Sequence, residues 1–188
     1  MRYSLSFRIW HWFNAMIIIG LLGTVFLRKT FLSWKTNSEI ITNQLAAINL
    51  EIGADQAKII AKAIRAEMWN WHIILGYGLA LMVFYRIVLF FIDKSQQKSW
   101  SELNGHKKIV KLSYYLLYGV LLFITVSGFV IYFHDFLSLS SAKVHDVKEF
   151  HEFLYNFVLL FVPLHIAGVF IAENRDEKGI VSTMINGE

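Results

Sequence analysis

Four long stretches without a charged side chain constrain what this chain of 188 residues can fold into. Asp, Glu, Lys and Arg are all missing from residues 9–27, 68–85, 112–134 and 153–172. At about 1.5 Å per helical residue, each stretch is long enough to cross a hydrocarbon core of about 30 Å. A soluble domain of this length cannot bury four helices that are apolar all round. The sequence therefore predicts an all-α fold, a four-helix transmembrane bundle.

Composition narrows the chemistry that such a chain can perform. The chain has no cysteine, so by itself it cannot hold an iron–sulfur cluster, a thioether-linked haem, a disulfide or a thiolate ligand. The first apolar stretch is too long for a cleavable signal peptide, and no small-residue cleavage motif follows it before Arg28. The formal charge of +4 is modest and spread over the loops, which favours contact with lipid headgroups and no binding of nucleic acid.

We expect one membrane domain over residues 1–188, with spans at about 9–29, 68–92, 109–134 and 148–172. An even number of spans places both termini on the same side. Nine basic residues lie on that side: Arg2, Arg8, Lys94, Lys98, Lys107, Lys108, Lys111, Arg175 and Lys178. Eight lie on the other: Arg28, Lys29, Lys35, Lys58, Lys62, Arg65, Lys143 and Lys148. The loop 93–111 is short and rich in lysine, and such loops weigh most, so we expect both termini in the cytoplasm.

The connection between the first two spans, residues 28–66, is too long to be a turn. Its apolar residues have helical spacing, interrupted at Gly53, and Ser38 and Asp55 are candidate helix caps. The sequence predicts two short amphipathic helices in an extramembrane insertion at 30–66. Two roles stay open for it, a lid that packs on the bundle or a docking surface for a partner.

Four histidines occupy defined depths in the predicted spans. His11 begins the first span on the termini side, whereas His72 and His151 begin the second and fourth spans on the opposite side. His165 follows His151 by 14 residues, which is about 21 Å of helix, so it is level with His11. The same 14 residues return to within roughly 40° of the starting direction. The spacing predicts two pairs, His72 with His151 and His11 with His165.

Paired imidazoles in an apolar span indicate a metal-bound porphyrin. A polar side chain in lipid needs a partner, and two haems with two histidines each account for all four rings. One histidine alone is compatible with a hydrogen-bonded packing residue, and four at paired depths favour haem. Zinc is disfavoured because two imidazoles without nearby carboxylates bind it poorly. An iron with two axial histidines is suited to electron transfer rather than to oxygen binding.

Two arginines belong to the same predicted sites. Arg8 lies about one turn before His11, and Arg86 follows His72 by 14 residues on the same helix face. Either guanidinium is expected to pair with a haem propionate or to polarise a quinone carbonyl. An interfacial, snorkelling side chain is the alternative for Arg8. For Arg86, whose next charged neighbour is Asp93, the functional interpretation is favoured.

Several segments resemble one known family. "RIWHWFNA" at 8–15, "WHIILGY" at 71–77, "YRIVLFF" at 85–91, "TVSGF" at 125–129 and "FHEFLYNFVLLFVPLHI" at 150–166 are similar to the motifs of the four spans of bacterial cytochrome b561 proteins. Within that family the chain looks closest to the b-type cytochrome subunits of nickel–iron hydrogenases, thiosulfate reductases and formate dehydrogenases. The tail "KGIVSTMINGE" at 178–188 resembles the hydrogenase branch.

The resemblance implies that His11, His72, His151 and His165 ligate two b haems in the pairs given above. It also implies electron exchange with a membrane quinone, in a multi-pass protein of the bacterial inner membrane with both termini inside. The long 28–66 connection departs from the compact family members and favours the branch that serves a redox partner subunit or an external cytochrome. Two other functions remain open, a self-contained superoxide:quinone oxidoreductase and a structural membrane anchor for a partner enzyme.

Overall fold

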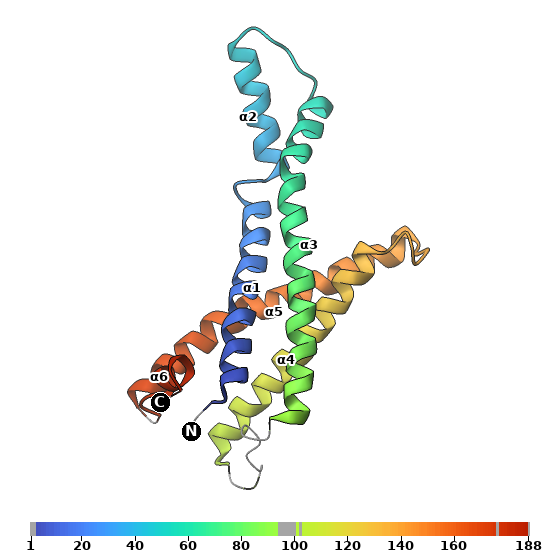
Figure 1. Ribbon diagram of the computed structural model, residues 1–188. Coiled ribbons are helices and arrows are strands. Elements are labelled where there is room, and N and C mark those ends of the chain that lie inside the picture. Colours follow the sequence, from blue (N-terminus) through green and yellow to red (C-terminus); the bar gives the residue numbers. More distant parts are fainter. Residues whose placement is uncertain (1–2, 94–100, 102, 176, 188) are drawn as a thin grey trace. The chain divides into compact units, whose positions relative to one another are not determined.

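The computed structural model describes residues 3–93, 101, 103–175 and 177–187 of the chain (Figure 1). The described residues form helices and no strand. In chain order the helices are α1 (Leu5–Lys29), α2 (Trp34–Ala47), α3 (Ala54–Ile92), α4 (Gly105–Tyr132), α5 (Ser141–Asn174) and α6 (Ile180–Ile185). Arg2, Lys94 and Lys98, which entered the orientation argument, lie outside the described residues.

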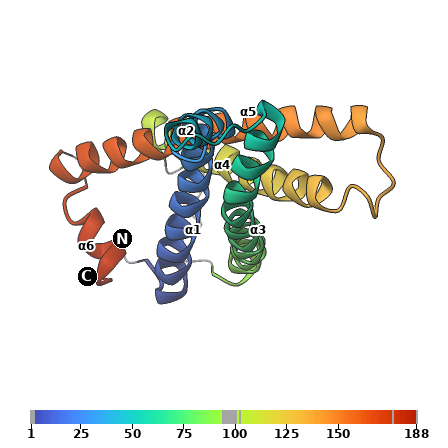
Figure 2. The same ribbon diagram turned by 90° about the horizontal axis from the view of Figure 1, so that it is seen from above.

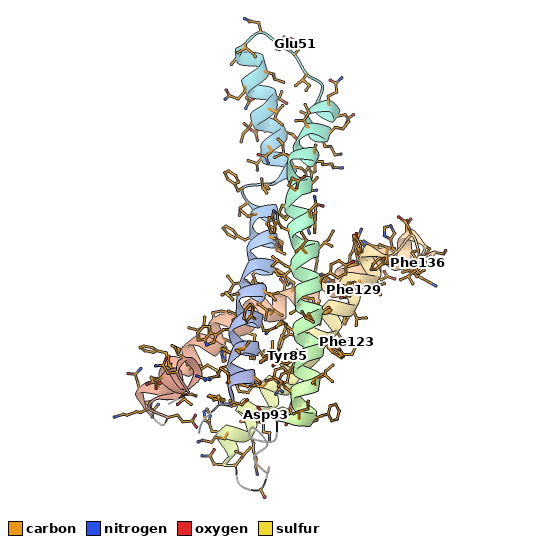
Figure 3. All side chains as sticks on the ribbon, viewed as in Figure 1. Glu51, Tyr85, Asp93, Phe123, Phe129 and Phe136 are labelled. Carbon is orange, nitrogen blue, oxygen red and sulfur yellow. The ribbon has the colours of Figure 1, made fainter. Side chains whose placement is uncertain are left out.

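Four of these helices, α1, α3, α4 and α5, are long and apolar enough to cross a membrane. The prediction of an all-α chain with four membrane-spanning helices is therefore confirmed. Large apolar side chains also stand on the outer surface of these helices. Figure 3 shows Phe123, Phe129 and Phe136 following one another along α4 and the turn after it. Phe123 is 56% exposed and Phe136 is 86% exposed, as expected of side chains that meet lipid rather than water.

Polar side chains satisfy backbone N–H groups at the starts of three helices. The Ser4 hydroxyl oxygen accepts a hydrogen bond from the Phe7 N–H at 3.2 Å, before α1. The Asn104 side chain accepts one from the Lys107 N–H at 3.0 Å, which caps α4. The Gln56 carbonyl accepts one from the Gly53 N–H at 2.9 Å, just before α3. These bonds replace partners that the first turn of a helix lacks.

The prediction of two short helices in the 28–66 insertion is right only for the first one, α2. The second is not separate, because residues from Ala54 onward continue without a break into the second span as α3. No proline lies within α3 to interrupt its backbone hydrogen bonds.

Both predicted caps in the insertion are wrong. Ser38 lies inside α2, where its hydroxyl donates to the Trp34 carbonyl at 2.6 Å, because the helix begins one turn earlier than the pattern indicated. Asp55 lies within the first turn of α3 instead of before it. There its negative charge complements the positive end of the helix dipole.

The described chain divides into two compact units, and the smaller is Met16–Gly78. Within this unit α1 and α3 approach each other closely at Gly20. A Cβ atom on Gly20 would lie 3.0 Å from the Leu75 Cδ1 atom. The Lys58 ammonium lies 5.0 Å from the centre of the Trp34 ring, so the start of α3 is in contact with α2.

The larger unit consists of Met1–Ala15 and Leu79–Glu188. In it α4 and α5 lie side by side and antiparallel, joined by a short turn (Figures 1 and 2). The short helix α6 folds back toward the start of α1 (Figures 1 and 2). The Trp12 indole N–H donates to the Met184 carbonyl at 3.2 Å, which ties α6 to the start of α1.

The contact at Gly20 gives a prediction about stability. Gly20→Val inserts atoms where the Leu75 side chain already lies, so we expect the free energy of unfolding to fall by about 1–3 kcal/mol. Gly23→Val is the matched control, because a Cβ atom there meets nothing within 4 Å and the change in helix propensity is the same. Thermal unfolding in detergent, followed by circular dichroism, measures both. An equal loss in the two variants would contradict close packing at Gly20.

Candidate functional site

His11 of α1 and His165 of α5 are the predicted site residues that the structure brings together. Their ring centroids lie 6.1 Å apart with an angle of 59° between the ring planes. Both side chains are half-buried. The Phe161 ring stacks on His165 at 6.0 Å, and the Tyr114 ring meets it edge-on at 5.9 Å. The rings of α4 and α5 therefore hold His165 beside His11.

The separation of these two rings suits ligands of a single metal ion. Two imidazoles bound on opposite sides of one ion, with metal–nitrogen distances of about 2 Å, have ring centroids roughly 6 Å apart. In the part of the chain that the structure describes, no three His, Cys, Asp or Glu side chains cluster to hold a metal. A metal held by these two imidazoles would need a group outside the protein to complete its coordination, and a porphyrin would be such a group.

His151 of α5 has a defined partner on α4. Its Nδ1 atom lies 2.9 Å from the Ser127 hydroxyl oxygen. The neighbouring Gly128 leaves space for the ring, since a Cβ atom there would lie 3.3 Å from the His151 Cε1 atom. The imidazole thus fits against α4 through one hydroxyl and one glycine.

His72 of α3 has a similar partner on α1. Its Nδ1 atom lies 2.8 Å from the Thr24 hydroxyl oxygen, and the Trp69 ring meets the imidazole edge-on at 5.5 Å. His72 belongs to the unit Met16–Gly78, whereas the other three histidines belong to the larger unit. Its pairing with His151 therefore stays a prediction from the spacing of the spans.

Arg86 lies in an aromatic box in the larger unit. Its guanidinium carbon is 4.6 Å from the centre of the Tyr118 ring and 5.4 Å from the rings of Phe7 and Trp10. The Arg86 Nη2 group donates to the Tyr118 hydroxyl at 3.4 Å, and its buried Nε has no hydrogen-bond partner. Within the described residues Arg86 forms no ion pair with a carboxylate. The Arg86 guanidinium can therefore still bind an anionic group or a carbonyl oxygen.

Arg8, the other predicted arginine, is engaged with the C-terminal segment. Its Nη1 group donates to the Ile185 carbonyl at 3.0 Å, while its buried Nε has no hydrogen-bond partner. Gly187 lies against the guanidinium, since a Cβ atom there would be 2.9 Å from the Arg8 Cζ atom. Gly187 also has a φ of 85°, which favours glycine. The structure therefore ties Arg8 to the end of the chain near the start of α1.

Sequence analysis missed the two hydroxyls that contact histidines and the ring that contacts Arg86. Thr24 and Ser127 are 7% and 5% exposed, and each is a polar residue within a charge-free stretch. A buried polar group in a span needs a partner, and that signal was available in the sequence. Tyr118 gave no such signal, because the chain has eight tyrosines and several lie at span ends.

Comparison with known proteins identifies the family to which this chain belongs. The family model described as prokaryotic cytochrome b561 matches residues 2–187. No curated protein and no solved structure matches the chain. The family match covers almost the whole sequence, including all four spans and every histidine considered above. The chain belongs to the prokaryotic cytochrome b561 family, and it is a membrane protein that transfers electrons on b-type haem.

Proposed function

We propose that this chain conducts electrons across the membrane through two b haems, one held by His11 and His165 and the other by His72 and His151. The observation that carries the proposal is the 6.1 Å separation of the His11 and His165 rings, which would let both imidazoles hold one haem iron. When bound, the haem supplies one-electron oxidation and reduction. An iron that was held by two histidines would be suited to electron transfer rather than to oxygen binding.

The protein's own side chains hold these imidazoles in place. His165 contacts the stacked ring of Phe161 and the edge-on ring of Tyr114, which limit how its imidazole can turn. His72 and His151 each have a hydroxyl at Nδ1, so their surroundings are alike although they lie in different units. This likeness supports the pairing of His72 with His151 that the span positions predicted.

We propose that Arg86 meets the negative charge or the carbonyl that these cofactors bring. Its side chain is a cation without a described counter-ion, and it contacts Trp10, the residue next to His11. A haem propionate of the His11/His165 site, or a quinone carbonyl beside it, provides the missing partner. Arg8 lies near the start of α1, as do the Phe7 and Trp10 rings that contact Arg86. It already donates to the Ile185 carbonyl and is the second candidate for binding a propionate or a quinone carbonyl.

The two ends of this conduit meet different partners in our proposal. The termini side faces the cytoplasm in the inner membrane and exchanges electrons with a quinone. The insertion between α1 and α3 faces a redox partner subunit or an external cytochrome, as in the partner-subunit branch of the family. Ile48, Leu50 and Ile59 of this insertion are 63%, 55% and 67% exposed, and exposed apolar side chains outside a span favour protein contact.

Loss of single histidines tests the pairing. We expect His72→Ala and His151→Ala to remove one and the same haem, and His11→Ala and His165→Ala to remove the other. Each variant is purified, its haem content is measured, and the remaining haem is assigned by its reduced absorption band and midpoint potential. If His72→Ala and His11→Ala lose a common spectral component, the assignment is wrong.

Arg86→Gln tests the role of the positive charge that the aromatic rings surround. A positive charge near a haem favours the state with the added electron, so its removal lowers the midpoint potential of the His11/His165 haem. We expect a fall on the order of 50 mV, about a tenfold change in the reduction equilibrium. Lys143→Gln, in the first turn of α5, removes the same charge elsewhere and is the control. An unchanged potential in Arg86→Gln would show that no propionate pairs with Arg86.

The insertion can be tested separately from the haems. Ile48→Asp combined with Ile59→Asp places two charges on its exposed apolar surface. We expect the haem spectrum and both midpoint potentials to stay unchanged, while electron exchange with the native redox partner in membranes falls at least severalfold. Unchanged exchange with the partner would contradict docking on the insertion.

A further inference from the structure

Two of the four histidines share a contact that the family assignment does not explain. His72 and His151 each have their Nδ1 atom within hydrogen-bond distance of a hydroxyl oxygen, at 2.8 Å from Thr24 and at 2.9 Å from Ser127. Each hydroxyl comes from the apolar helix that precedes the histidine's helix among the candidate spans, α1 for His72 and α4 for His151. Each contact lies within one of the two units.

Counting protons gives the arrangement that satisfies every polar group in these two contacts. A hydroxyl group has one proton to donate and two lone pairs. The Thr24 hydroxyl donates its proton to the Leu21 carbonyl at 2.7 Å, and the Ser127 hydroxyl donates to the Ile124 carbonyl at 3.1 Å. With that proton directed to the carbonyl, each hydroxyl oxygen accepts from the imidazole. We therefore assign the proton of each neutral ring to Nδ1.

This proton position determines how the rings can bind metal. A neutral imidazole with its proton on Nδ1 carries its free lone pair on Nε2, which is then the nitrogen that can ligate. A partner that accepts from the other ring nitrogen of a metal-bound histidine fixes the tautomer and the ring orientation, and it raises the basicity of the ligand. Thr24 and Ser127 place their hydroxyl oxygens at the Nδ1 atoms of His72 and His151, the ring nitrogens that need such a partner.

The two hydroxyls also occupy equivalent places in their helices. Thr24 lies five residues before the last residue of α1, and Ser127 lies five residues before the last residue of α4. Both are almost fully buried, and a glycine is the immediate neighbour of each. One position used twice, with the same two bonds, indicates the same role at both histidines.

The other pair of histidines is different. Within the described residues, neither His11 nor His165 has a hydroxyl at a ring nitrogen, and their contacts are with aromatic rings and with each other. The two haem sites of the proposed function therefore differ in what supports their ligands. Such a difference changes how strongly the ligands donate electrons to the metal.

We infer that Thr24 and Ser127 are positioning residues that hold His72 and His151 in the ligating tautomer and lower the redox potential of the haem bound there. The inference rests on the proposed function, since it requires that these two histidines ligate a haem. The hydroxyls act by accepting the Nδ1 proton. An imidazole whose N–H is bonded to an acceptor is the more basic ligand, and a more basic ligand stabilises the oxidised metal.

Removal of each hydroxyl at nearly constant shape tests the inference. Thr24→Val and Ser127→Ala are prepared as full-length, haem-loaded protein in detergent. The redox titration of each haem and the low-temperature electron paramagnetic resonance spectrum of the oxidised protein are recorded. We expect the His72/His151 haem to become easier to reduce, by about two- to tenfold, which is roughly 20–60 mV at 59 mV per tenfold. Its resonance positions should shift as the ligand rings reorient, while those of the His11/His165 haem stay in place.

Matched variants separate this role from packing. Thr24→Ser and Ser127→Thr keep the hydroxyl and should restore the wild-type potential and spectrum. Thr30→Val and Thr125→Val are the controls, since these hydroxyls donate to the Phe26 and Leu121 carbonyls on the same two helices. If a hydroxyl-free variant loses only the His72/His151 haem, and the conservative variant restores it, the result also supports positioning.

Three outcomes would overturn the inference. The hydroxyl-free variants keep both potentials and both spectra of the wild type, the controls shift them equally, or the shift appears on the His11/His165 haem. These results differ from a failure of the proposed function. In that case His72→Ala and His151→Ala would not remove a common haem, whatever the hydroxyl variants show.

Discussion

An imidazole in an apolar span must find partners for two ring nitrogens, and the candidate sites of this chain depend on that requirement. Water satisfies such groups in a soluble protein, but the hydrocarbon core offers none. At His72 and His151 a hydroxyl from a neighbouring helix is placed at one nitrogen. In the function proposed above, a haem iron binds the other nitrogen. The membership of the chain in a family of b-type cytochromes agrees with this chemistry.

The surrounding helices supply positions rather than reactive groups. Glycines at Gly20 and Gly128 let a helix or an imidazole approach the backbone, and aromatic rings on α4 and α5 surround His165. Arg86 adds one positive charge inside an otherwise apolar environment, held by contacts with three aromatic rings. Since the haem supplies the redox chemistry, the protein has only to hold the ligating imidazoles, place a positive charge near them and control which molecules reach the site.

Sequence reasoning found the spans because four charge-free stretches of such length have few other uses. It also singled out His11 and His165, which the structure brings together. The spacing of 14 residues from His151 to His165 predicts both the depth of His165 in the membrane and the face of the helix on which it lies. It missed Thr24 and Ser127, since the meeting of a hydroxyl with a ring on another helix depends on helix packing and side-chain rotation. It was wrong about a separate second helix in the insertion. Gly53, the glycine that interrupts the apolar pattern, lies directly before α3. The helix then continues without a break to Ile92.

The most direct test of the central claim is the number and coordination of haems in the purified chain. A pyridine haemochrome assay, related to the protein concentration from amino-acid analysis, gives the number per chain. Electron paramagnetic resonance of the oxidised protein gives the coordination. We expect two b haems per chain, both low-spin with two histidine ligands. Colourless protein that retains its helical structure, a single haem, or a high-spin signal from an iron with one axial ligand would contradict it.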